Sequence, residues 1–225
     1  MSELDGLTYV RPAEIEARSF QIISDELGCL ALSPEELLVV KRVIHTTADF
    51  DYAQTLHFTP HAVERGIAAL ASGATVVTDT TMVAAGINKR VLGSLGGEVR
   101  TFIGDADVAE EARLRGVTRS AVAMERAARL EGPVVFAIGN APTALARLAR
   151  LISEGSMANP ALVIGVPVGF VNVVESKELM MATPVESIVA AGRKGGSNVA
   201  AAIVNALLYQ ASGNRREEGG WLWKP

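Results

Sequence analysis

Four short apolar runs, separated by segments with helical periodicity, constrain the fold of this chain more than any other feature. The runs span residues 75–78, 134–138, 162–166 and 187–190, and a weaker fifth run spans 99–103. Short apolar runs bounded by turn residues are typical of strands buried on both faces of a parallel sheet. The intervening helical segments are 106–115, 119–130, 141–154, 175–181 and 198–210. This alternation predicts an α/β fold with right-handed crossovers and helices on both faces of the sheet.

The first third of the chain is predicted to be mainly helical. Residues 12–27 and 60–72 have helical periodicity, and Gly73 ends the second of these segments. Between them, Ser33-Pro34-Glu35-Glu36 combines an N-cap, a proline at the first helical position and a capping-box glutamate. Because no linker or repeat interrupts the chain, we expect one domain over residues 1–211. Residues 212–225 are predicted to be a loosely ordered tail, in which Trp221 and Trp223 are able to dock on a neighbouring surface.

Composition narrows the function classes. The net charge is −4 and aromatic residues make up 5% of the 225 residues, which disfavours nucleic acid and anionic membranes as partners. The single cysteine, Cys29, excludes an internal disulfide and any cysteine-rich metal site. The N-terminus is acidic without an apolar core, and no apolar run reaches the ~18 residues that span a bilayer. These features predict a cytoplasmic protein.

The segment from Arg42 to Asp49 contains the candidate catalytic residue. Leu37, Val40 and Val43 recur at helical spacing, so His45 is expected in the last turn of a helix. The unpaired carbonyls there favour imidazolium and predict a raised pKa. Arg42, three residues earlier, shares a face with His45. A proton donor beside a fixed cation suits an anionic substrate, although most histidines at helix C-termini only stabilise the helix.

Three glycine-containing loops are predicted at the carboxyl ends of the strands, where open parallel sheets place their sites. They span residues 139–143, 165–172 and 192–198, and the last contains Arg193 and Lys194. Glycines and free N–H groups near helix starts suit a phosphate or a carboxylate, although strand-to-helix turns need glycine in any case. The loops together predict an anion site.

Other site types are disfavoured by the sequence. It contains neither G-x-x-x-x-G-K-[ST] nor G-x-G-x-x-G, the two phosphate motifs, and it lacks the G-x-S-x-G elbow of esterases. His57 and His61 are separated by Thr59-Pro60, so their rings need not share a face. We therefore expect no protein metal site.

The chain resembles the precorrin-8X methylmutase family of cobalamin biosynthesis. The order and spacing of the matching segments, from about Glu14 to Leu207, carry the resemblance. They are residues 18–23, 42–49, 82–86, 118–121, 139–145, 165–171, 175–177 and 192–198. The resemblance implies a flavodoxin-like parallel sheet, a homodimer with sites at or near the interface, and no cofactor.

The family reaction implied by this resemblance is an isomerisation. A methyl group moves from carbon 11 to carbon 12 of a corrin-type macrocycle and gives a cobyrinic or hydrogenobyrinic acid skeleton. The resemblance places the catalytic histidine at His45. The substrate contacts that follow from it and from the loops are Ser19, Arg42, Arg119, Asn140, Thr143, Gly169, Ser176, Lys177, Arg193, Lys194, Gly195, Gly196 and Ser197. A macrocycle rimmed with carboxylates suits several helix starts and cations.

Three alternatives stay open at this point. Family members act on metal-free or cobalt-containing substrates. The sequence of residues 45–50 resembles the cobalt-handling branch more closely. Any cobalt would belong to the substrate. A carrier of the same pathway would bind the tetrapyrrole without chemistry. A phosphosugar or nucleotide enzyme on a flavodoxin-like sheet is disfavoured by the missing phosphate motifs.

Overall fold

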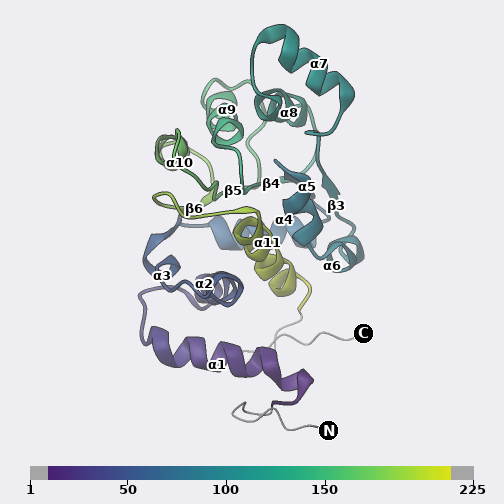
Figure 1. Cartoon of the computed structure of the whole chain (residues 1–225). Coiled ribbons are helices and arrows are strands. Elements are labelled where there is room, and N and C mark those ends of the chain that lie inside the picture. The colour runs from purple at the N-terminus through teal and green to yellow at the C-terminus, as the bar shows by residue number, and fades with distance from the viewer. Residues whose placement is uncertain (1–9, 214–225) are drawn as a thin grey trace, which may run out of the picture.

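One six-stranded sheet organises residues 10–213, the part of the chain that the computed structural model describes (Figure 1). The strands are β1 (Leu56–Phe58), β2 (Thr75–Thr78), β3 (Glu98–Arg100), β4 (Val134–Ile138), β5 (Leu162–Gly165) and β6 (Ser187–Ala190). Their order is β1-β6-β5-β4-β2-β3. Strands β2 to β6 are parallel, and β1 pairs antiparallel with β6. Numbered along the chain, the five parallel strands have the order 2-1-3-4-5 of flavodoxin-like folds, as predicted.

The strand predictions are confirmed for all four strong apolar runs, and β5 ends one residue earlier than expected. The weak fifth run, predicted at 99–103, corresponds to β3, which begins one residue earlier and ends three residues earlier. The structure adds to the predicted parallel sheet one antiparallel edge strand, β1, which the sequence does not predict. β1 is three residues long and its central His57 is exposed, so it lacks the apolar run that reveals the other strands.

The helices form layers on the two faces of the sheet (Figure 1). Their bounds are α1 (Ile15–Leu27, preceded by the 3-10 turn Pro12–Glu14), α2 (Pro34–Thr47), α3 (Tyr52–Thr55), α4 (Ala62–Ala71), α5 (Thr81–Gly86), α6 (Lys89–Ser94), α7 (Ala106–Arg115), α8 (Arg119–Ala127), α9 (Pro142–Ser153), α10 (Val173–Met181) and α11 (Ser197–Ala211). Helices α7 to α10 cover one face, and α2, α4, α5, α6 and α11 cover the other. Helix α1 lies outside α2 as an outer layer.

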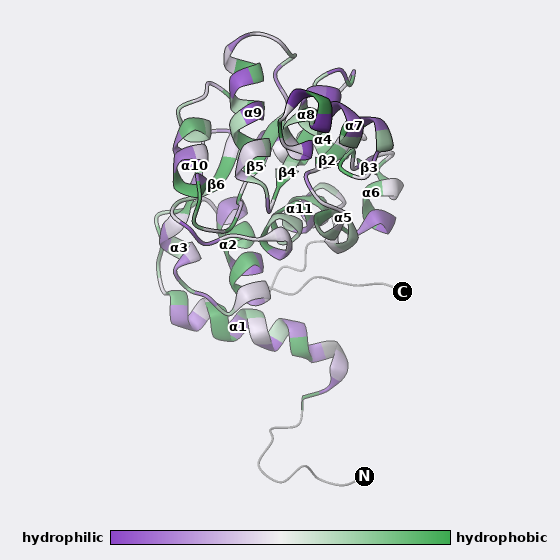
Figure 2. Cartoon of the chain, turned by 45° about the horizontal axis from the view of Figure 1, so that its top comes forward, coloured by the Kyte–Doolittle hydropathy of each residue, from purple (hydrophilic) through white to green (hydrophobic). Residues whose placement is uncertain are grey.

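The two cores meet across the strands. In β4, Val135 and Ala137 belong to one core, whereas Val134, Phe136 and Ile138 belong to the other. This alternation follows from the two-residue period of a strand and explains why the run is apolar at every position. In Figure 2 the strands of the sheet are largely hydrophobic, whereas the outer helices α7 and α8 carry many hydrophilic residues.

Helix bounds follow the local signals in most places. The capping box of α2 is formed, with Ser33 and Glu36 bonded to each other's backbone N–H groups. Helix α4 begins at Ala62, two residues after the predicted start at Pro60, and α8 ends three residues early at Ala127. Helices α3, α5 and α6 were not predicted, because each is too short for a periodic pattern. The predicted loose tail spans residues 212–225. All of it except residues 212 and 213 lies outside the described residues.

Close backbone approach makes one loop glycine irreplaceable. A Cβ atom built on Gly195 would lie 2.1 Å from the Val166 carbonyl oxygen, whereas one on the exposed Gly93 of α6 has no other atom within 4 Å. Only a hydrogen atom fits at Gly195, so the loops that follow β5 and β6 lie in direct contact.

We expect Gly195→Ala to lower the free energy of unfolding by about 2–3 kcal/mol, because the added methyl group forces the two backbones apart. Gly93→Ala is the matched control and changes it by less than about 1 kcal/mol, in the stabilising direction, since alanine favours a helix. Urea unfolding of the two variants measures both effects. Equal stability of the two variants would contradict the contact.

Candidate functional site

The loops that follow β2, β5 and β6 at the carboxyl edge of the sheet are bonded to one another. The N–H of Gly196, after β6, donates to the Val166 carbonyl after β5 (2.9 Å). The hydroxyls of Thr80, after β2, and Ser197 lie 3.3 Å apart. The N–H of Gly169 donates to the Arg193 carbonyl (3.3 Å). A Cβ atom built on Gly139, after β4, would lie 2.9 Å from the Gly196 carbonyl oxygen, so the structure brings the three predicted glycine loops together along one edge of the sheet.

Asp79, directly after β2, occupies the amides of the first of these loops. Its buried carboxylate accepts the N–H groups of Gly139 (3.0 Å), Asn140 (2.8 Å) and Ala141 (2.7 Å). Burial raises the pKa of Asp79, and the three bonds oppose that rise. The expectation of free amides here is therefore wrong, because an internal carboxylate already fills the anion position. The exposed side chains of Asn140 and Thr143 remain accessible, and the Thr118 hydroxyl donates to that of Thr143 (3.1 Å).

Lys177 plays the complementary part in the loop after β6. Its side chain is fully buried, and Nζ donates to the carbonyl oxygens of Gly192 and Lys194, each at 2.8 Å. Burial lowers the pKa of Lys177 to about 8. The neighbouring Ser176 is also buried and donates to the Val173 carbonyl (2.9 Å). In this structure both residues, predicted as substrate contacts, are turned inward and hold the protein's own backbone.

Lys194 ties the same loop to the end of α2. Its Nζ lies 2.7 Å from Asp49 Oδ2 and 2.6 Å from Asp51 Oδ2, and these carboxylates raise the pKa of Lys194. Arg193, the other predicted cation, is exposed, and its guanidinium carbon lies 5.5 Å from the centre of the Phe170 ring. Of the two, Arg193 is the cation placed to meet an anion from solution.

His45 lies in the last turn of α2, as predicted, and its side chain is exposed. Its Nδ1 lies 2.9 Å from the Ser19 hydroxyl of α1, and its ring stacks on Phe20 with centroids 5.2 Å apart. Helix α2 stops directly afterwards, because Ala48 adopts a left-handed conformation at φ 54°. The imidazole is therefore oriented from two sides at the edge where Lys194 joins α2 to the glycine loops.

Arg42 is held inside the α1–α2 interface. It is 8% exposed, its Nη1 lies 2.6 Å from Glu16 Oε1, and its guanidinium lies over the rings of Phe20 (4.7 Å) and Tyr209 (5.4 Å). Its charge therefore acts beside His45 from within the protein. Arg119, by contrast, is exposed at the first position of α8, on the side of the sheet that α7 to α10 cover.

The raised pKa expected for His45 is wrong. Partial burial and the positive charge of Arg42 lower the pKa of His45, and the Glu16 carboxylate opposes them to a smaller extent. Desolvation disfavours the imidazolium, and this effect exceeds that of the helix C-terminus. In the free protein at neutral pH, His45 is therefore mainly a neutral imidazole.

Sequence reasoning missed the residues that support the site. Asp79, Glu16 and Phe20 fix the amides, the arginine and the histidine respectively. Asp79 carries a signal in hindsight, because it is an acidic residue directly after an apolar strand. Glu16 lies 26 positions from Arg42 in the sequence, and Phe20 lies 25 positions from His45 (45 − 20), so neither carries such a signal.

Within residues 10–213, no group of three or more histidine, cysteine or acidic residues is placed to hold a metal ion. No helix in the same range is long and apolar enough to cross a membrane. The expected absence of a cofactor and the cytoplasmic location stay predictions.

Known proteins resemble this chain over nearly its whole length. A family model described as precorrin-8X methylmutase matches residues 14–210. A cobalt-precorrin-8 methylmutase from Priestia megaterium is 45% identical, with 97% of this chain and 96% of that protein covered. One from Salmonella typhimurium is 47% identical, with 88% and 95% covered.

The same fold occurs in a solved relative. A crystal structure of a precorrin-8X methylmutase from Thermus thermophilus superposes with a TM-score of 0.81 at 40% identity, covering 89% of this chain and 98% of that one. The names of these relatives favour the enzyme over the carrier alternative. On the family match and these identities, the chain belongs to the precorrin-8X methylmutase family, whose members are isomerases.

Proposed function

We propose that this chain moves a methyl group from carbon 11 to carbon 12 of a precorrin-8-type macrocycle, with His45 as the acid. The observation that carries the proposal is the exposed His45–Ser19 pair at the carboxyl edge of the sheet, in a chain of this family. The product has the cobyrinic acid skeleton, and no atom is gained or lost.

The edge around His45 suits a flat molecule with acidic side chains. Arg193 is exposed beside Phe170, of which 83% is exposed, so a cation and an aromatic face lie together. Arg119 offers a second exposed cation and Asn140 an exposed amide. Guanidinium groups bind carboxylates in bidentate fashion, so we assign the acetate and propionate groups of the substrate to these side chains.

The neutral His45 of the free protein gains its proton with the substrate. Carboxylates brought close to the ring favour the imidazolium and raise its pKa. Because Ser19 engages Nδ1, the other nitrogen, Nε2, faces the macrocycle. Nε2 then donates its proton or a hydrogen bond to the conjugated ring system, which lowers the barrier to methyl migration, and recovers it when the product forms.

The proton acceptor depends on the metal. In a metal-free macrocycle, the ring nitrogens are available to Nε2. In a cobalt-containing one they are ligated, so the proton goes to a ring carbon or to a carboxylate edge. The relatives from Priestia megaterium and Salmonella typhimurium are named for the cobalt substrate, and we propose the same substrate for this chain.

A homodimer with sites near its interface completes the proposal. Helix α1 is an outer layer and exposes Ile15 (55%) and Ile22 (44%), two apolar side chains that a second subunit would cover. Ser19 lies on the same helix, so a second subunit packed on α1 would stand beside His45. Two subunits would enclose a large ring more completely than one sheet edge.

Glu16→Gln should lower the pKa of His45 further below its ordinary value of 6.5, because the variant removes the charge that opposes Arg42. The imidazolium fraction at a given pH then falls. Titration of the histidine ring signals by NMR in the free protein measures the shift. Glu64→Gln is the matched control, since it removes an exposed carboxylate that contacts only His61 among the histidines. A His45 pKa above 6.5 in the unsubstituted protein would contradict the assignment.

His45→Ala should reduce turnover by at least about 100-fold, the lower end of general acid catalysis, and leave product affinity nearly unchanged. Substrate and product of an isomerisation have the same mass, so the conversion is followed by the visible absorbance of the macrocycle. His57→Ala, an exposed histidine on β1, is the control and retains full turnover.

Ser19→Ala separates orientation from chemistry. It keeps the imidazole but frees Nδ1, so turnover should fall by about tenfold, less than for His45→Ala. Near-normal turnover of His45→Ala would refute its role as the acid.

The cobalt-containing substrate should be converted with the higher kcat/KM. Parallel anaerobic assays with the cobalt and metal-free forms measure the ratio, and mass spectrometry confirms the metal content of each substrate. A preference for the metal-free form would overturn this part of the proposal and leave the role of His45 untouched.

A further inference from the structure

A groove lies at the opposite end of α2 from His45. Ser33, Glu35 and Glu36 line one side, at the start of α2, and Pro60, Val63, Glu64, Ile67 and Ala68 line the other, in and before α4. We name this feature the α2–α4 groove; its volume is about 610 Å³. Nine residues at about 1.5 Å each separate Glu36 from His45, so the groove is about 14 Å from the site along the helix axis.

The α2–α4 groove combines an apolar floor with an acidic rim. Val63 is buried and Ile67 half-buried, whereas Glu64 and Ala68 are exposed. The eight lining residues include three glutamates and no lysine or arginine. An occupant that is both apolar and cationic fits this surface.

Helix α11 ends beside the α2–α4 groove. It packs against both α2 and α4, with Leu207 directly over Gly66. Near its end, Gln210 donates from Nε2 to the Glu35 carbonyl, at 3.4 Å. Since Glu35 lines the groove and α11 ends at Ala211, the segment that follows begins beside the groove.

The segment that follows has the matching composition. Residues 214–225 lie outside the described structure and read Asn-Arg-Arg-Glu-Glu-Gly-Gly-Trp-Leu-Trp-Lys-Pro. Two tryptophans and a leucine stand next to Lys224, and Gly219-Gly220 separates them from the acidic pair. Twelve residues reach up to about 40 Å when extended, so length does not limit access to the groove.

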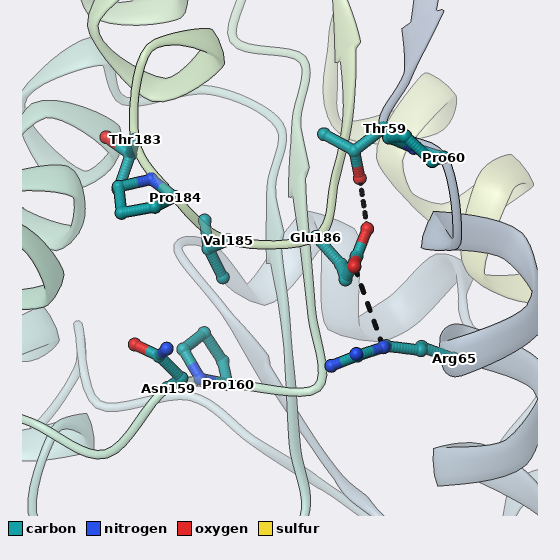
Figure 3. Close-up of a pocket in the computed structure, with 9 residues that line it drawn as sticks. All are labelled: Thr59, Pro60, Arg65, Asn159, Pro160, Thr183, Pro184, Val185 and Glu186. Atoms are coloured by element: carbon teal, nitrogen blue, oxygen red, sulfur yellow. Dashed lines mark hydrogen bonds and ion pairs between the residues drawn. The ribbon is translucent and has the colours of Figure 1, made fainter.

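A second hollow lies beside the groove and, unlike the groove, contains both a positive and a negative side chain (Figure 3). It shares Pro60 with the groove and is lined by Arg65, Asn159 and Glu186 among others. Glu186 is already engaged there, since it accepts the Thr59 hydroxyl (2.5 Å) and lies 3.6 Å from Arg65. The charges of Arg65 and Glu186 offset each other in this hollow, whereas the groove carries three glutamates and no cation, so charge assigns Lys224 to the groove.

We propose that the C-terminal segment docks in the α2–α4 groove of its own subunit, with Trp221 to Trp223 on Val63 and Ile67 and Lys224 at the acidic rim. The segment thereby covers an apolar surface on the amino side of the sheet. This docking is independent of the reaction at His45.

Tryptophan fluorescence reports on the segment alone, because Trp221 and Trp223 are the only tryptophans of the chain. In the full-length protein we expect emission at a shorter wavelength than in a free peptide of residues 214–225, and severalfold weaker quenching by acrylamide. Glu64→Lys with Ala68→Arg places two cations and added bulk in the groove on exposed positions of α4. That double variant should shift emission and quenching to the values of the free peptide.

Glu110→Lys with Leu114→Arg is the matched control, because both side chains are exposed and lie four residues apart on α7. It should emit as the unsubstituted protein does, and circular dichroism and methylmutase turnover should be unchanged in both double variants. Emission of the unsubstituted protein equal to that of the free peptide would overturn the docking. A shift to longer wavelength on dilution would assign the groove to the segment of a second copy and overturn docking within one subunit.

Discussion

Two buried charges hold the carboxyl edge of the sheet, and the candidate site depends on them. The Asp79 carboxylate accepts hydrogen bonds from the backbone N–H groups of the loop after β4. Lys177 Nζ donates hydrogen bonds to backbone carbonyl oxygens of the loop after β6. Each charge satisfies backbone groups that would otherwise cost about 1–3 kcal/mol when buried. A buried charge without those partners is still more unfavourable, so loop and side chain fix each other. The edge is therefore preorganised before any substrate arrives.

This arrangement changes how the glycine loops contribute to binding. Their backbone groups were expected to bind an external anion, and in the first loop an internal carboxylate already does so. In the loop after β6, glycine is needed for contact between backbones, because a Cβ atom on Gly195 would lie 2.1 Å from the Val166 carbonyl oxygen. In the proposed function, recognition of a carboxylate rim therefore depends on exposed side chains, of which Arg193 and Arg119 carry positive charge.

The sequence predicted what local patterns encode. Apolar runs located β2, β4, β5 and β6, and the capping box located α2 and so placed His45 in its last turn. It did not predict β1, which has one exposed residue in three, or the ion pair of Arg42 with Glu16 on another helix. The prediction of a raised pKa for His45 was wrong for the same reason. Partial burial against α1 is a tertiary effect, and it lowers the pKa more than the local helix end raises it.

The lowered pKa of His45 makes its acidity depend on what is bound. Without a ligand, partial burial and the charge of Arg42 lower the pKa of His45 and so favour the neutral imidazole. A polycarboxylate that settles on the same edge reverses the balance of charge and also excludes water, which strengthens each remaining interaction. A neutral tetrapyrrole of the same shape would leave His45 unprotonated. In the proposed mechanism, charge on the macrocycle rim therefore contributes twice, once to affinity and once to the protonation state of His45.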